Sequence, residues 1–192
     1  MDMPHVIYGI RNPAVEVSDY QPDWEDRFRE LKKLLSPLEH LVVHVGSTSV
    51  PGLAAKPVID ADMILEDWNM REDVIAALAR LGFIYRGDLG IPGREAFSET
   101  LRLPFAHNFY LCRENSEALH NHLLLRDYLR ENPADALRYG NLKKQLAALY
   151  PEDVDQYCIR KSDLIAELLS KAGMDSAGVS NIRTLNLNPI QD

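Results

Sequence analysis

A helical repeat of apolar residues stands out early in the chain. In the stretch "QPDWEDRFRELKKLLSPL" four of them recur at intervals of three or four positions, namely Trp24, Phe28, Leu31 and Leu35. Such spacing places the residues on one face of a helix that packs against a core. Pro22 suits the first turn, and acidic residues near the start with lysines near the end favour the helix dipole. The pattern predicts a helix over residues 21–38.

Strand patterns fill most of the remaining sequence before residue 115. Short runs that are rich in β-branched residues, or that alternate between apolar and polar, are typical of strands. They cover residues 12–20, 40–45, 56–65 and 106–113, and the loop-rich segment 83–104 has strand character at each end. A second helix, closed by a glycine, is expected over residues 70–82.

After residue 115 the pattern becomes helical. Three segments, over residues 117–131, 134–149 and 156–172, are separated by an asparagine–proline and a tyrosine–proline pair. The last twenty residues carry little pattern, and we expect them to fray or to dock late.

These patterns together predict an α/β (α+β) fold in three parts. Residues 1–115 should form a mixed sheet with flanking helices, and residues 116–173 a C-terminal bundle of about three helices packed on it. Residues 174–192 should be a tail.

The strand expected over residues 56–65 has two unlike faces. One face is wholly apolar and belongs in a core, and the other carries Asp60 and Asp62 between Val58 and Ile64. Two like charges so close destabilise each other unless a cation or water neutralises them. Magnesium suits the pair, because it binds one or two carboxylates together with phosphate oxygens. On these two residues alone, a half-exposed strand with solvated acids is the stronger alternative.

A small-residue loop, "GSTSVPGL", precedes this strand. Gly46 permits a close approach or a positive φ, and Ser47 is expected to cap a short helical turn. The hydroxyls of Thr48 and Ser49 and the backbone N–H groups of the turn could face an anion. Loop and aspartates together favour a site for a metal-bound polyphosphate, and a plain tight turn is the alternative.

Two helices of the second half repeat one pattern, a tyrosine followed four positions later by a lysine. Tyr139 precedes Lys143, and Tyr157 precedes Lys161, so each pair shares a helical face. A base or ribose over the ring and a phosphate at the ammonium would fit. Lysine stems also pack over tyrosine rings without any ligand, and this alternative stays open.

Several further polar residues are candidates for the same site. Arg126 and Lys56 are candidate phosphate contacts, with a solvated lysine as the alternative for Lys56. His44 and His107 could support the loop or the aspartates, and a buried structural histidine is the alternative for each. His120 and His122 lie two positions apart on a helix and point to different sides, so we do not expect them to share a metal.

Composition narrows the classes of partner. The 192 residues, 46% of them hydrophobic, can bury a core as one domain with a helical appendage. A net charge of −8 disfavours binding to long nucleic acids, whose backbone rewards a basic face. No apolar run reaches the roughly 18 residues of a membrane span, so we expect a cytoplasmic protein with no membrane partner. Cys112 and Cys158 lie far apart and are interpreted as reduced, partly buried thiols.

The segment "GSTSVPGLAAKPVIDADMIL" resembles the GrpB family, a group of small proteins assigned to the nucleotidyltransferase superfamily. The resemblance continues through "VEVSDYQPDWEDRF", "LGFIYRGDLGIPGREAF", "HNFYLC", "LLLRDYLRENPADALRYGNLKKQLA" and "YCIRKSDLIAELL", and covers residues 14 to 172. It implies a nucleotidyltransferase-like sheet in which Gly46 and Ser47 contact nucleotide phosphates. It also implies that Asp60 and Asp62 hold magnesium or manganese ions.

The same resemblance implies a third carboxylate on a later strand. The expected strand "HNFYLC" places Asn108 and Tyr110 on one face and carries no acid. Glu95 and Glu99 precede it, but no motif places them in the site.

The resulting hypothesis is magnesium-dependent transfer of a nucleotidyl group from a nucleoside triphosphate to a hydroxyl of a small molecule or protein, by a monomer or small homo-oligomer. The alternatives are a non-catalytic nucleotide-binding or phosphate-binding module of the same fold, and a structural or interaction protein.

Overall fold

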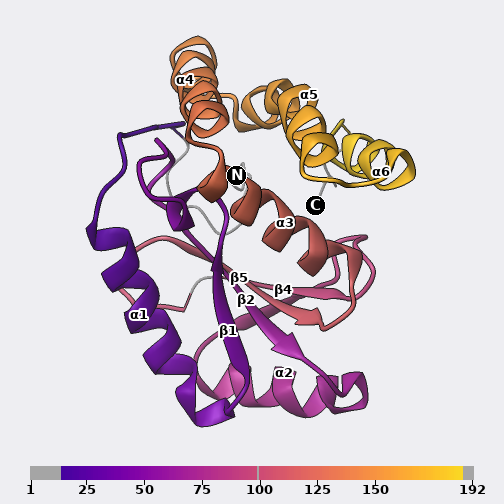
Figure 1. Cartoon of the computed structure of the whole chain (residues 1–192). Helices are drawn as coiled ribbons and strands as arrows, with labels where there is room; N and C mark the ends of the chain where they lie inside the picture. The colour runs from indigo at the N-terminus through magenta and orange to yellow at the C-terminus, as the bar shows by residue number, and fades with distance from the viewer. Residues whose placement is uncertain (1–13, 99, 188–192) are drawn as a thin grey trace, which may run out of the picture.

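A five-stranded mixed sheet lies at the centre of the computed structural model, which describes residues 14–98 and 100–187 (Figure 1). In spatial order the strands are β1 (Leu41–Val45), β2 (Ile59–Leu65), β5 (His107–Arg113), β4 (Arg94–Ser98) and β3 (Ile84–Gly87). Strands β2 and β5 are parallel, and the other neighbouring pairs are antiparallel. The predicted α/β fold with a mixed sheet is confirmed.

One face of the sheet is covered by α1 (Asp23–Leu35) and α2 (Arg71–Arg80). The apolar face predicted for α1 is fully used, because its four core residues are buried against the sheet. The apolar face predicted for β2 packs here as well, with Ile59, Ala61, Met63 and Leu65 at most 1% exposed. Burial of this kind contributes roughly 25 cal/mol per Å² of apolar surface removed from water, so this layer is the main core.

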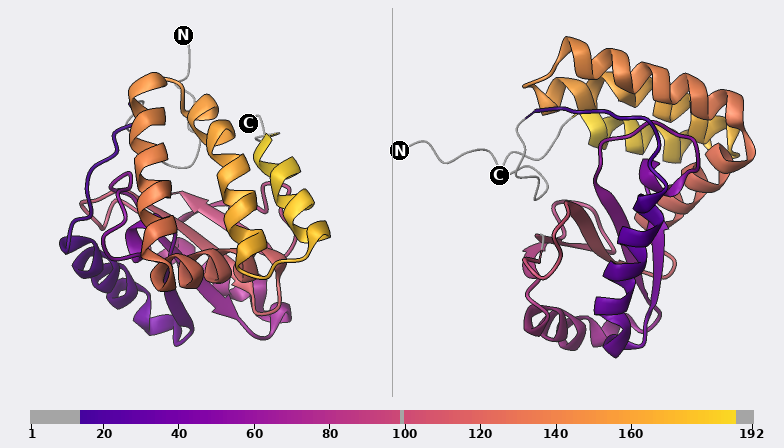
Figure 2. Two further views of the ribbon diagram at one scale, coloured as in Figure 1. Left: turned by 45° about the horizontal axis from the view of Figure 1, so that its top comes forward. Right: turned by 90° about the vertical axis from the view of Figure 1, so that its left-hand side faces the viewer.

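The opposite face of the sheet, which carries the aspartates, is covered by α3 (Glu117–Glu131). Leu119 and Leu123 of this helix pack against Tyr110 and Cys112 of β5. Three further helices follow, α4 (Pro133–Leu149), α5 (Val154–Lys171) and α6 (Ser176–Leu187). They lie side by side as a layer beyond one end of the sheet (Figure 2). The polar face of β2 therefore lies toward this helical layer.

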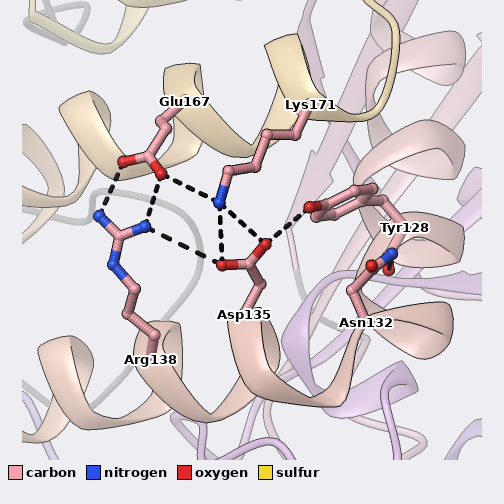
Figure 3. A network of polar contacts seen from close by, with 6 residues as sticks. All are labelled: Tyr128, Asn132, Asp135, Arg138, Glu167 and Lys171. Atoms are coloured by element: carbon pink, nitrogen blue, oxygen red, sulfur yellow. Dashed lines mark hydrogen bonds and ion pairs between the residues drawn. The ribbon is translucent and has the colours of Figure 1, made fainter.

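A network of charged and polar groups ties α3, α4 and α5 together (Figure 3). The hydroxyl of Tyr128 donates a 2.6 Å hydrogen bond to Asp135, which also pairs with Lys171 at 3.1 Å. Arg138 binds Glu167 with two hydrogen bonds of 2.5 and 2.7 Å. Two-point contacts of this kind fix direction as well as distance, so the network adds polar contacts between α4 and α5 to their apolar packing.

The strand predicted over residues 12–20 is wrong for the part of it that is described. Residues 14–20 form only one bridge, between Ser18 and Ala55. Val15 instead packs on Leu146 and Tyr157 of the helical layer, and its N–H donates to the carbonyl of Pro151 at 2.6 Å. The alternation in this segment therefore reflects packing on helices rather than strand pairing.

The expectation of little regular structure in the last twenty residues misses α6. Asp175 accepts a 2.7 Å hydrogen bond from the N–H of Gly178 and so starts the helix. Ile182 is buried, and α6 packs against α5. A capping aspartate with apolar residues at Val179 and Ile182 was the overlooked signal. Within the described ranges no helix is long and apolar enough to cross a membrane.

Candidate functional site

The loop after β1 packs directly on the first aspartate of β2. Gly46 has φ 68° and ψ −172°, a conformation open almost only to glycine. A Cβ at this position would overlap the carboxylate of Asp60. Both reasons for a glycine that the sequence suggested, a positive φ and a close approach, therefore apply at this position. The turn Ser47–Ser49 follows as a short 3-10 helix (η2).

The three hydroxyls of this turn have different roles. Thr48 donates to the carbonyl of Val58 at 3.2 Å, and Ser49 donates to the carbonyl of Gly46 at 2.6 Å. Both are buried and hold the loop in place. No side chain caps the turn, so the cap expected from Ser47 is wrong. Ser47 instead lines two neighbouring cavities and hydrogen-bonds with Tyr139.

His44 helps to hold this loop in place. Its Nε2 lies 3.0 Å from the Thr48 hydroxyl, and its ring stacks on Phe28 at 4.6 Å. Burial lowers the pKa of His44 to about 4, against the opposing effect of Glu25. The ring is therefore neutral at physiological pH, with Nδ1 3.5 Å from a carboxylate oxygen of Glu25.

The two aspartates have different environments although they share one face of β2. Asp60 accepts a 2.7 Å hydrogen bond from Asn108, its neighbour on β5. Asp62 is fully buried, and its Oδ2 accepts a 2.7 Å bond from Nδ1 of His122 on α3. Within the described ranges nothing donates to the other oxygen of Asp62. A buried carboxylate oxygen without a donor is costly, and a cation beside it would offset that cost.

Burial acts on the ionisation of this face. It raises the pKa of Asp60, against the lowering effect of the Asn108 hydrogen bond. Burial alone would lower the pKa of His122, but the Asp62 carboxylate outweighs it and raises that pKa. A cation placed beside the aspartates would relieve the cost of the buried negative charge.

The donor set fits magnesium only together with phosphate oxygens. Among residues 14–98 and 100–187 no group of three His, Cys, Asp or Glu side chains could hold a metal by itself. Asp60 and Asp62, one with an unpartnered oxygen, would supply the one or two carboxylates that magnesium takes beside phosphate.

A cavity of about 180 Å³, which we call the lysine cavity, opens beside Asp60 and Ser47. Lys56, Lys143 and Lys161 line it. The side chain of Lys143 is 2% exposed, and within the described part of the chain its Nζ has no hydrogen-bond partner. Burial and the neighbouring Lys161 hold the pKa of Lys143 well below its usual range. An anion in this cavity would supply the missing partner.

Both tyrosine–lysine pairs meet as the spacing predicted. Nζ of Lys143 lies 4.5 Å from the ring centre of Tyr139, and Nζ of Lys161 lies 4.4 Å from that of Tyr157. The two rings are buried, at 4% and 1% exposure. The lysines therefore occupy the ring faces on which a base was expected to stack, and the rings position the ammonium groups.

A second, larger cavity of about 670 Å³ lies on the other side of Asp60, and we call it the α3–α6 cavity. Gly46, Ser47, Asp60 and Lys161 all line it, and three of these also line the lysine cavity. Arg126 lines it too, and donates to the carbonyl of His44 at 3.1 Å. Asp60 therefore stands in the wall between two cavities.

Other candidates lie away from this wall. His107 pairs in register with Ile59 and so points to the α1–α2 face, where Thr100 and Phe105 bond both ring nitrogens. Glu95 points to that face too and accepts from Tyr85 at 2.6 Å. Glu99 lies outside the described residues.

The position expected for a third carboxylate holds none. Asn108 and Tyr110 are the β5 residues beside Asp60 and Asp62. Conversely, the sequence interpretation set His122 aside, although it binds Asp62. Its place opposite a strand face on a covering helix was not visible from spacing along the chain.

Comparison with known proteins shows the family and the fold. A family model described as GrpB protein matches residues 14–171. The UPF0157 protein YqkA of Bacillus subtilis is 34% identical over 79% of this chain, which spans 45% of the length of that relative.

Two solved structures share the fold. The crystal structure of the conserved protein GrpB from Enterococcus faecalis is 38% identical and covers 82% of this chain and 96% of its own, with a TM-score of 0.71. The Cid1 poly(U) polymerase with MgGTP bound covers 68% of this chain and 44% of its own, at 17% identity and a TM-score of 0.50. The latter likeness shows a nucleotidyltransferase-like fold.

Proposed function

This chain belongs to the GrpB family, and on that premise we propose that it transfers a nucleotidyl group from a nucleoside triphosphate, bound with magnesium or manganese, to a hydroxyl group. The acceptor is a small molecule or a protein, and the reaction is cytoplasmic. The observation that carries the proposal is the place of Asp60, in the wall between a cavity lined by lysines and a larger one.

The lysine cavity suits the phosphate groups of the triphosphate. A water molecule occupies about 30 Å³ in the liquid, so 180 Å³ holds phosphates but not a nucleoside as well. Lys143 supplies a buried ammonium without a described partner, and Lys56 and Lys161 add positive charge beside it. Ser47 adds a hydroxyl at the boundary with the α3–α6 cavity.

The remaining groups position the reaction. Asp60 and Asp62 would hold the metal, and the Asn108 hydrogen bond with the close contact of Gly46 fixes the Asp60 carboxylate. Magnesium bound there would lower the pKa of the acceptor hydroxyl and neutralise charge on the phosphates. The acceptor hydroxyl loses its proton to water, and its oxygen bonds to the α-phosphorus as the bond from that phosphorus to the β-phosphate oxygen breaks. Pyrophosphate leaves toward the lysines.

A second candidate function is a nucleotide-binding module without turnover. Asn108 favours it, because it occupies the position beside Asp60 where the superfamily pattern implies a carboxylate. An amide cannot take over the charge or the proton that a third carboxylate would.

The test follows the α-phosphate. Wild type and Asp60→Asn are incubated with each of the four α-labelled ribonucleoside triphosphates, magnesium and a small-molecule cell extract, and label transfer and pyrophosphate are measured. Glu66→Gln, an exposed acid just past β2, is the matched control. Transfer in wild type and Glu66→Gln, lost in Asp60→Asn, supports the enzyme. Triphosphate binding with neither transfer nor pyrophosphate supports the second candidate.

A further inference from the structure

The α3–α6 cavity differs in chemistry from the lysine cavity. Its walls are mainly apolar side chains from three helices, among them Leu125, Leu129, Ile165, Leu169 and Ile182. These helices are α3, α5 and α6, and Figure 2 shows them from two sides. Pockets that bind small organic molecules are typically apolar with a few well-placed polar groups.

One such polar group is Arg94, on β4. Its side chain is buried at 5% exposure and its guanidinium stacks on the ring of Tyr110 at 4.5 Å. Neither Nε nor Nη2 has an acceptor among the residues that the structure describes. A buried guanidinium with two unpartnered nitrogens is costly unless an acceptor binds it, and its planar fork matches a carboxylate.

The other charged groups of this cavity have contacts of their own, as Asp60 has with Asn108. Arg126 binds Asp127 and the carbonyl of His44. Glu117 accepts two 3.1 Å hydrogen bonds from Asn181. His122 binds Asp62 at 2.7 Å, and Lys161 lies over Tyr157. Among the residues that the structure describes, Arg94 is the cationic side chain of this cavity with buried nitrogens that lack an acceptor.

Asn121 is a second polar group without a described partner. Its Oδ1 is buried and lines the same cavity. It would accept a hydrogen bond from a hydroxyl or amide of a ligand, so the cavity offers one cationic contact and one acceptor within apolar walls.

We propose that the α3–α6 cavity binds a small monocarboxylate with an apolar body, whose carboxylate pairs with Arg94. Within the described part of the chain, Arg94 is the cation of this cavity with unpartnered buried nitrogens, and one guanidinium matches one negative charge. Multiply charged phosphates are matched by Lys56, Lys143 and Lys161 of the lysine cavity, the last of which lines both cavities. That this ligand is also the acceptor, with a hydroxyl reaching toward Asp60, rests on the proposed nucleotidyl transfer. The binding itself does not.

The experiment uses octanoate as the probe, titrated calorimetrically into the full chain at pH 7 without nucleotide or metal. Octanoate should bind wild type, and Arg94→Met should weaken the binding at least about tenfold, because it removes a charge-assisted contact. Arg160→Met, an exposed arginine of α5 outside this cavity, is the matched control and should leave the affinity unchanged. Ile182→Trp should block binding by filling the cavity from α6, a peripheral helix whose change leaves the sheet intact.

Octanol and inorganic phosphate complete the design. Octanol should bind more weakly than octanoate, and Arg94→Met should not affect it. The proposal is overturned if octanoate fails to bind wild type, if Arg94→Met binds it equally well, or if phosphate alone binds in an Arg94-dependent way. Loss of octanoate binding with magnesium–triphosphate binding intact refutes this proposal alone. The reverse result refutes the proposed nucleotide site alone.

Discussion

The two faces of the sheet treat buried polar groups differently. On the face toward α1 and α2, His107 and Glu95 have partners for both ring nitrogens and both carboxylate oxygens. On the side of α3 to α6, atoms of Asp62, Arg94 and Lys143 have none among the described residues. These three belong to side chains that carry charge in water.

The α1–α2 side is not free of unpaired atoms, but their character differs. Nε1 of Trp24 has no hydrogen-bond partner there within the described ranges, and Nδ1 of His44 lies 3.5 Å from a carboxylate oxygen of Glu25. The indole is uncharged, and burial keeps His44 neutral at physiological pH, with a pKa of about 4. Unpaired charge thus distinguishes the face that carries the proposed ligand sites from the face that packs on α1 and α2.

The largest effect should come from the glycine that joins the loop to the aspartate. Gly46→Ala places a Cβ at a positive φ and against Asp60, and should lower the free energy of unfolding by about 4 kcal/mol. Gly52→Ala has a positive φ of 80° but open space around it, so it should cost clearly less. Chemical denaturation of both variants measures the difference. Equal losses would mean that the contact with Asp60 adds nothing.

On the α1–α2 face, removing a partnered group should destabilise the fold. His107→Phe leaves the N–H of Thr100 and the carbonyl of Phe105 without partners, and should cost about 2–3 kcal/mol of unfolding free energy. His120→Phe, an exposed site on α3, serves as control and should change little. A His107→Phe variant as stable as wild type would contradict the comparison between the faces.

On the side of α3 to α6, removing an unpartnered buried group should stabilise the fold rather than destabilise it. Lys143→Met replaces a buried amine that has no described partner, and should raise the free energy of unfolding by about 1–2 kcal/mol without ligand. The same change should weaken binding of pyrophosphate. Lys144→Met, a more exposed neighbour paired with Asp19, should change neither. Destabilisation by Lys143→Met would show that the lysine is structural.

A smaller effect, whose direction can be predicted, is the change in stability with pH that Asp60 causes. Because burial raises the pKa of Asp60 in the folded state, its contribution to stability is full below the unfolded pKa of about 4. That contribution is lost as pH rises through the higher folded value. An asparagine does not ionise, so Asp60→Asn does not lose stability as the pH rises. Its melting temperature should exceed that of wild type by a few degrees at pH 7 and match it near pH 3. A wild type more stable than the variant at pH 7 would contradict the assignment.

Local pattern predicted the elements of the fold well because they depend on short-range spacing. The apolar face of β2 and the helices over residues 117–131, 134–149 and 156–172 lie within a few residues of where the sequence placed them. The strand predicted around Val15 was wrong because alternation of apolar and polar residues does not reveal whether the segment packs on a strand or on a helix. The sequence analysis missed helix α6 because the helix contains only a few apolar residues.

The site was predictable as far as it follows from one strand and one loop. Gly46, Asp60 and Asp62 could be placed from spacing alone. The contact of Asp62 with His122 joins residues 60 positions apart, and the unpaired Arg94 has no motif of its own. Such features depend on which helix covers which face, and this is decided by tertiary packing.

The most direct test of the nucleotide site is a thermal-shift titration of the four ribonucleoside triphosphates with and without magnesium, on wild type and Asp60→Asn. A ligand that binds the folded state raises the melting temperature as its concentration passes the dissociation constant. Our account predicts a magnesium-dependent rise in wild type that disappears in Asp60→Asn. No rise with any triphosphate, or an equal rise in the variant, would contradict it.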